Sequence, residues 1–138
     1  NTWTTISNNG AGAFTNLAYL PSGVTELMDT ADGSFDFSQL NLGDNVLIRN
    51  DYEVTPNVNN ALLEIRYELG TSSGFYTLPT VLGRLDDGSG KPYRKALKPD
   101  MIYMGDLNTK DNKITVQLRL SSNGTVINYG SAIGVIKR

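Results

Sequence analysis

Residues 70–74 read Gly-Thr-Ser-Ser-Gly and fit the G-x-S-x-G pattern, which presents a nucleophilic serine in many hydrolases. Such a serine needs a histidine or a lysine to remove its proton. The chain contains no histidine, and no serine is followed three residues later by a lysine. The motif also lies between two β-type segments, whereas a nucleophile elbow joins a strand to a helix. We therefore predict a loop between strands and no serine hydrolase site.

Two carboxylates on one strand could serve as the acid and base of a glycosidase. Glu64 and Glu68 share a face of the predicted strand 61–69, with Arg66 between them. Four residues of strand separate them by roughly 13 Å, whereas glycosidase pairs lie about 5–10 Å apart. These residues indicate a charged outer face. A pair built from different strands stays open, but we expect no enzyme activity.

Two acidic loops, residues 29–36 and 86–90, raise the question of a calcium site. The first contains Asp29, Asp32 and Asp36, and the second contains Asp86 and Asp87. Calcium requires six to eight oxygen ligands, and neither loop has the D-x-D-x-D-G spacing with a distal glutamate. We predict solvated turns, with no metal and no cofactor.

Composition excludes several further classes. The chain has no cysteine, so disulfides and thiolate metal sites are ruled out. Its 12 basic and 14 acidic residues give a net charge of −2, which argues against a nucleic-acid partner. No apolar run approaches the roughly 20 residues of a membrane span, so we expect no membrane partner. Asn1 is not an initiator methionine, and whether it is the native start stays open.

Alternating apolar and polar residues predict most of the elements. The clearest strand is 113–120, and Ser121-Ser122-Asn123-Gly124 then predicts a hairpin turn to a partner strand at 125–129, because Asn-Gly tolerates positive φ. Further strands are predicted at 34–37, 46–54, 61–69, 75–82, 101–104 and 131–137, and short helical turns at 22–28 and 95–98. This pattern predicts an all-β protein, an antiparallel sandwich of about eight short strands with one or two helical turns. Residues 1–20 are predicted to form an N-terminal arm or edge segment, and residues 21–138 a single domain.

A basic cluster contains five of the 12 positive charges: Arg84, Lys91, Arg94, Lys95 and Lys98. It could contact an acidic partner surface, a polysaccharide or phosphate, or it could be a solvated connection that Asp86 and Asp87 partly neutralise. Asn123-Gly124-Thr125 is also an N-glycosylation sequon, although a tight turn accounts for Asn-Gly without a glycan.

Residues 42–70 read LGDNVLIRNDYEVTPNVNNALLEIRYELG. A Gly-Asp turn opens a strand, a T-P-x-x-N-N turn follows, and an amphipathic strand ends at glycine. This stretch resembles the jelly-roll head domains of tailed-phage virion proteins, which are similar in build to the tumour-necrosis-factor-like fold. The resemblance implies a homotrimer in the virion that contacts the major capsid protein or another virion protein. Such domains occur as capsid decoration proteins, head fibres and tail-fibre tips.

Several predicted strands carry apolar residues on both faces, which favours subunit contacts. The residues expected at the subunit interface are Leu47, Leu62, Val126 and Ile136. The residues expected to dock to a capsid shell are Trp3, Phe14, Tyr19, Arg94, Lys95 and Lys98. The alternative function is a receptor- or glycan-binding tip of a tail fibre, with Tyr76, Tyr93, Tyr103 and Tyr129 as candidate platforms. The host, the capsid or tail location, and the order of trimerisation and attachment stay open.

Overall fold

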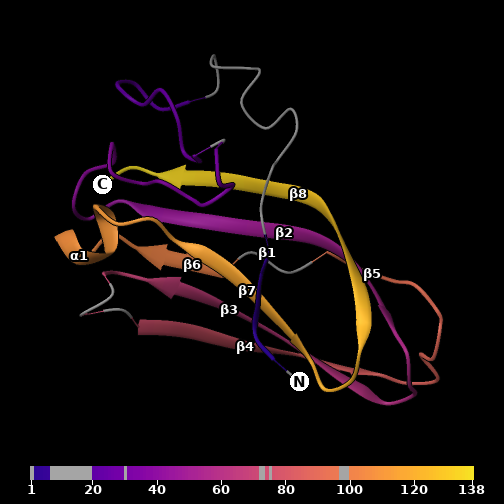
Figure 1. Cartoon of the computed structure of the whole chain (residues 1–138). Helices are drawn as coiled ribbons and strands as arrows, with labels where there is room; N and C mark the ends of the chain where they lie inside the picture. Colours follow the sequence, from indigo (N-terminus) through magenta and orange to yellow (C-terminus); the bar gives the residue numbers. More distant parts are fainter. Residues whose placement is uncertain (1, 7–19, 30, 72–73, 75, 97–99) are drawn as a thin grey trace.

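The computed structural model describes residues 2–6, 20–29, 31–71, 74, 76–96 and 100–138. In this part of the chain the protein is nearly all β, and its antiparallel sheets lie as two layers (Figure 1). The strands are β1 (Thr4–Ile6), β2 (Asn45–Pro56), β3 (Ala61–Leu69), β4 (Tyr76–Leu85), β5 (Tyr93–Ala96), β6 (Asp100–Tyr103), β7 (Thr115–Leu120) and β8 (Gly124–Ile136). One helical turn, α1 (Leu107–Lys110), precedes β7. The all-β class predicted from the alternating pattern is confirmed.

The pairing of the strands is nested along the chain. One sheet has the order β1-β7-β3-β4. In the other, β8 runs along the whole of one edge of β2, while β6 and β5 pair with successive parts of the opposite edge. The first long strand therefore pairs with the last, and β3 pairs with β7, the last strand but one.

Alternation decides which side chains form the core between the layers. In β3, Leu63, Ile65 and Tyr67 are buried and the residues between them are partly exposed. In β2 the inward set is Val46, Ile48, Asn50, Tyr52 and Val54. Asn50 is the polar member of this set: its amide donates to the Tyr67 hydroxyl at 2.7 Å, and the Ser131 hydroxyl donates to its carbonyl at 2.6 Å. A buried amide with partners in β3 and β8 joins the two sheets through the core.

The predicted hairpin between 113–120 and 125–129 is wrong. β7 pairs with β3 on one edge and with β1 on the other, so it has no edge left for β8. Instead, β8 pairs with β2 in the opposite sheet. Residues 121–123 therefore carry the chain from one layer to the other.

The two predicted helical turns are also wrong. At 22–28 the chain forms turns and a single bridge, because Gly23 has φ +81° and the Gln39 side chain accepts from the backbone N–H of Thr25 at 2.7 Å. Residues 93–96 form β5 against β2, and residues 97 and 98 lie outside the described part. The turn that does form, α1, starts at Asp106, whose carboxylate accepts from the backbone N–H of Thr109.

The remaining strand predictions need smaller corrections. The segment 34–37 is reduced to a bridge, in which Phe35 pairs with both Met28 and Ile114. The two strands expected at 125–129 and 131–137 are one strand, β8, which bulges next to Gly130 at φ +110°. The segment predicted as an arm or edge contributes β1, an edge strand paired with β7.

A buried carboxylate holds the C-terminal end of the chain. Asp44 accepts from the backbone N–H of Asn41 and Arg138 and from the Lys137 ammonium, each at 2.9 Å. Burial alone would raise the pKa of Asp44, but these hydrogen bonds outweigh it and hold the pKa at about 2, below its usual 3.8.

We expect Asp44→Ala to lower the free energy of unfolding by about 2 kcal/mol, because it leaves buried donors without an acceptor. Lys137→Gln is the control: its side chain is more exposed, so a loss below about 1 kcal/mol is expected. Because folding lowers the pKa, the stabilisation is complete above pH 4 and is lost as the pH falls through about 2. Urea titrations at several pH values measure both effects. A difference between wild type and Asp44→Ala that is as large at pH 2 as at neutral pH would contradict this account.

Candidate functional site

The four residues predicted at a subunit interface do not lie on one surface. Leu47 and Ile136 share the outer face of the sheet that contains β2 and β8, because Asn45, two residues before Leu47, is opposite Ile136. Leu62 lies on the outer face of the other sheet. Val126 is opposite buried Val54 and so faces between the sheets. The structure brings together only Leu47 and Ile136.

Two further apolar residues join this pair from β6. Met101 is opposite Leu47 in the register, and Tyr103 is opposite Asn45. Met101 is 58% exposed, and Tyr103 and Ile136 are also exposed. We call Leu47, Met101, Tyr103 and Ile136 the outer apolar face. The predicted strand 101–104 already indicated Met101 and Tyr103. Because Ile102 and Met104 lie in the core, the alternation of a strand directs Met101 and Tyr103 outward.

β8 extends this surface along an edge of its sheet. Its 13 residues, Gly124–Ile136, include no charged residue and no proline, and none is buried. Among the described strands only β2 pairs with it. Proteins usually protect long edge strands with charges, prolines or a covering segment. β8 has neither charges nor prolines along its length, so it lacks these two protections.

The opposite outer face is polar and is organised around Trp3. The guanidinium carbons of Arg66 and Arg119 lie 4.4 and 4.6 Å from the centre of the Trp3 ring. Arg119 also pairs with Glu64 at 2.7 Å, and Arg66 donates to Gln117 at 2.6 Å. Trp3, predicted to dock to a shell, thus packs over two arginines of its own sheet.

The other predicted docking residues are not brought together by the described part. Arg94 and Lys95 belong to β5, where they pair with the backbone of β2. Phe14, Tyr19 and Lys98 lie outside the described residues.

The Gly-Thr-Ser-Ser-Gly segment follows β3 directly, and Ser72 lies outside the described residues. The segment is attached to α1 by Asn108. The Asn108 side chain accepts from the backbone N–H of Thr71 at 3.2 Å and donates to the carbonyl of Gly74 at 3.0 Å. Gly70 has φ +89°, and a Cβ there would lie 2.6 Å from the Asn108 amide nitrogen. These contacts define a loop whose ends are held by hydrogen bonds.

The acidic loops are paired with lysines. The Lys113 ammonium lies 2.5 Å from Asp29 and 2.9 Å from Asp32. Its hydrogen bond lowers the pKa of Asp29, and the two carboxylates, Asp29 first, raise the pKa of Lys113. In the second loop Asp87 pairs with Lys91. No group of three acidic or histidine side chains that could hold a metal occurs among the described residues.

The four tyrosines considered as a glycan platform are dispersed. Tyr76 belongs to β4 of the β1-β7-β3-β4 sheet, and its hydroxyl shares a hydrogen bond of 2.6 Å with the Thr109 hydroxyl in α1. The Tyr93 hydroxyl donates to the backbone carbonyl of Asp86. Tyr103 lies near the start of β2, whereas the Tyr129 hydroxyl is 3.4 Å from Glu53, near its end. They form no common surface.

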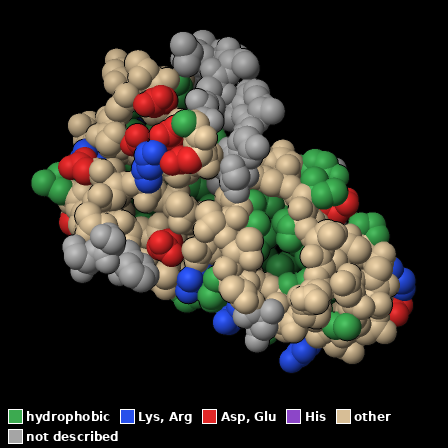
Figure 2. All heavy atoms as spheres, in the orientation of Figure 1, with side chains coloured by type: hydrophobic (Ala, Val, Ile, Leu, Met, Phe, Trp, Pro, Cys, Tyr) green, Lys and Arg blue, Asp and Glu red, His purple; other side chains and the backbone are tan. Residues whose placement is uncertain are grey.

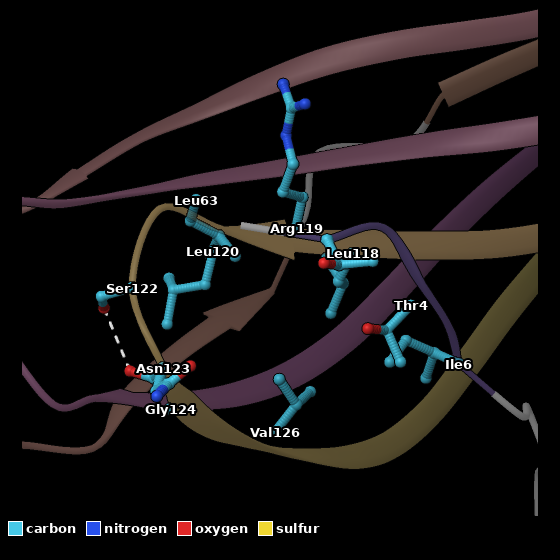
Figure 3. Close-up of a pocket in the computed structure, with 11 residues that line it drawn as sticks. Thr4, Ile6, Leu63, Leu118, Arg119, Leu120, Ser122, Asn123, Gly124 and Val126 are labelled. Atoms are coloured by element: carbon cyan, nitrogen blue, oxygen red, sulfur yellow. Dashed lines mark hydrogen bonds between the residues drawn. The ribbon is translucent and has the colours of Figure 1, made fainter.

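A cavity of about 430 Å³ opens between the sheets near the start of β8. It is lined by Thr2, Thr4, Ile6, Leu63, Leu118, Arg119, Leu120, Ser122, Asn123, Gly124 and Val126 (Figure 3). In the orientation of Figure 1, the space-filling view shows a hollow with hydrophobic side chains at its floor (Figure 2). We call this hollow the end cavity. Sequence reasoning missed it, because its walls come from strands whose pairing was not predicted.

Comparisons with protein-family models, with curated proteins and with solved structures gave no match to this chain. No helix in the described part is long and apolar enough to cross a membrane. The candidate surfaces are therefore the outer apolar face with the β8 edge, the polar face around Trp3, and the end cavity.

Proposed function

We propose that the chain is a non-enzymatic structural protein of a tailed-phage virion. In this proposal it forms a homotrimeric jelly roll and attaches to the capsid exterior as a decoration or head-fibre protein. Two antiparallel layers support it, as does the nested pairing of β2 with β8 and of β3 with β7.

The outer apolar face is the observation that carries the proposal. Leu47, Met101, Tyr103 and Ile136 come from three adjacent strands and present apolar side chains on the side away from the core. The charge-free strand β8 continues the surface to the edge of the sheet. Contact with other copies would remove this surface from water and cover the edge, which is the usual role of such patches.

The proposed mechanism is thermodynamic and needs neither a cofactor nor a chemical step. A protein that binds the assembled capsid lattice, and not its separate subunits, shifts the equilibrium toward the intact shell by mass action. The residues proposed for docking are Trp3, Phe14, Tyr19, Arg94, Lys95 and Lys98.

Light scattering from micromolar to tens of nanomolar protein tests the oligomeric state. We expect a mass near three times 15.0 kDa. Met101→Glu should weaken assembly roughly 100-fold, because it buries an unpaired carboxylate at the interface. Val58→Glu is the matched control: Val58 is 47% exposed in the turn after β2, at the opposite end of that strand from Leu47, and its replacement should leave the mass unchanged.

A monomer at every concentration, or equal effects of the two substitutions, would contradict this interface.

A receptor- or glycan-binding tip is the second candidate. The polar face favours it, because an indole beside arginine, glutamate and glutamine side chains suits a polyhydroxylated ligand.

A further inference from the structure

The end cavity lies beside Val126, near the start of β8. Val126 faces between the sheets, yet it is 37% exposed, whereas its neighbour in the register, Val54, is fully buried. Further along β8, Ile133 and Val135 on the same face pack against the core. Among the residues that the structure describes, no side chain closes the gap at Val126.

The first residue of β8, Gly124, cannot fill the cavity either. Gly124 lies in its wall, and a Cβ there would lie 2.6 Å from the Thr55 carbonyl oxygen and 2.7 Å from Leu120. Any side chain at this position would displace the backbone. The cavity therefore lies at the point where the chain crosses from one sheet to the other.

The floor of the cavity is apolar and its rim is polar but uncharged. Leu63 and Leu118 are buried core residues, and Ile6, Leu120 and Val126 surround them. The rim carries the hydroxyl and amide groups of Thr2, Thr4, Ser122 and Asn123. A ligand that fits this lining is apolar over most of its surface and hydrogen-bonds at one end.

Among the described residues that line the cavity, Arg119 is the one with an ionised side chain, and its charge is directed elsewhere. Its guanidinium pairs with Glu64 and lies over the Trp3 ring on the outer face of the sheet. Figure 3 shows its side chain pointing away from the other lining residues. The cavity thus offers no counter-charge, and burying an ionised ligand group there would be unfavourable.

We propose that the end cavity binds a neutral, mostly aliphatic small molecule with one hydrogen-bonding group at its end. Its volume of about 430 Å³ lies in the lower part of the range for small-molecule sites, roughly 300–1,000 Å³. The aliphatic part lies on Leu63 and Leu118, and the polar end reaches the rim at Thr4, Ser122 and Asn123. This site does not depend on the virion proposal.

Binding of 1-octanol to the full chain, followed by methyl NMR, tests the proposal. We expect saturable shifts at the methyl groups of Leu63, Leu118 and Val126. Octanoate has the same chain with a carboxylate and should bind at least tenfold more weakly. Shifts that do not saturate, or that are absent up to the solubility limit of octanol, would overturn the proposal.

Val126→Phe should fill the cavity and weaken octanol binding at least tenfold. Ile127→Phe is the control, because Ile127 is 50% exposed on the opposite face of the same strand and should bind octanol as wild type does. If Val126→Phe fails to fold, the position of the shifts and the preference for octanol over octanoate still decide the question. Equal affinity in the two variants would show that the space is not a ligand site.

Discussion

Phe35→Ala is expected to lower the free energy of unfolding by about 3–5 kcal/mol, the largest effect we expect for a single substitution in this chain. Phe35 is fully buried, and its ring stacks on Phe37 with centroids 6.0 Å apart. Its backbone also exchanges hydrogen bonds of 2.9 Å with Ile114 and pairs with Met28. Phe35 therefore lies where the segment before β2 meets the residue that precedes β7. Truncation would leave a cavity at the junction of three parts of the chain.

Leu42→Ala is the control for this substitution. Leu42 belongs to the same segment but is 44% exposed, so its truncation should change stability by no more than about 0.5 kcal/mol. Urea unfolding curves of both variants, measured by tryptophan fluorescence and circular dichroism, give the comparison. A loss below about 1 kcal/mol for Phe35→Ala would mean that residues 20–44 do not pack into the core.

The sequence predicts the strands well because alternation is a local property. In the predicted strand 61–69, Leu63, Ile65 and Tyr67 alternate with the charged residues 64, 66 and 68, and all three are buried. In β2 the inward positions are apolar except for Asn50, which alternation alone does not identify as a core residue. A polar residue at a core position is acceptable only with partners, and its partners Tyr67 and Ser131 lie 17 and 81 residues away.

Which strands pair is not a local property, and here the prediction was wrong. Strand 113–120 and strand 125–129 are adjacent in the sequence with a turn signal between them, so a hairpin was expected. Whether β7 has an edge available depends on β1, which comes more than a hundred residues earlier. The periodic pattern contains no information about that contact.

The candidate surfaces also depend partly on local alternation, which the sequence predicts, and partly on strand pairing, which it does not. Leu47 was predicted correctly to face outward, but its neighbour Met101 could be found only from the register of β6. Leu62 lies on the outer face of the opposite sheet, whereas Val126 lines the end cavity. A set of interface residues chosen from composition therefore mixes three surfaces, which pairing alone separates.

Gly124→Ala is expected to lower the free energy of unfolding by about 2 kcal/mol. The sequence favoured glycine here because an Asn-Gly hairpin turn requires positive φ at both residues. In the structure neither Asn123 nor Gly124 has positive φ. Glycine is needed for space instead, since a Cβ would lie 2.6 Å from the Thr55 carbonyl oxygen and 3.1 Å from the Pro56 Cα. Backbone atoms cannot move aside as the end of a flexible side chain can.

Gly134→Ala separates this cause from a general effect of replacing glycine in β8. Gly134 lies in the same strand without positive φ, and the nearest atom to its Cβ would be the Leu47 Cβ at 4.0 Å. Its replacement should be neutral or stabilising by up to about 1 kcal/mol, because alanine restricts the unfolded chain. Chemical denaturation of the two variants gives the difference directly. Equal stabilities would mean that β8 does not begin against Thr55 and Pro56, and the hairpin between β7 and β8 would then become the better account of this part of the chain.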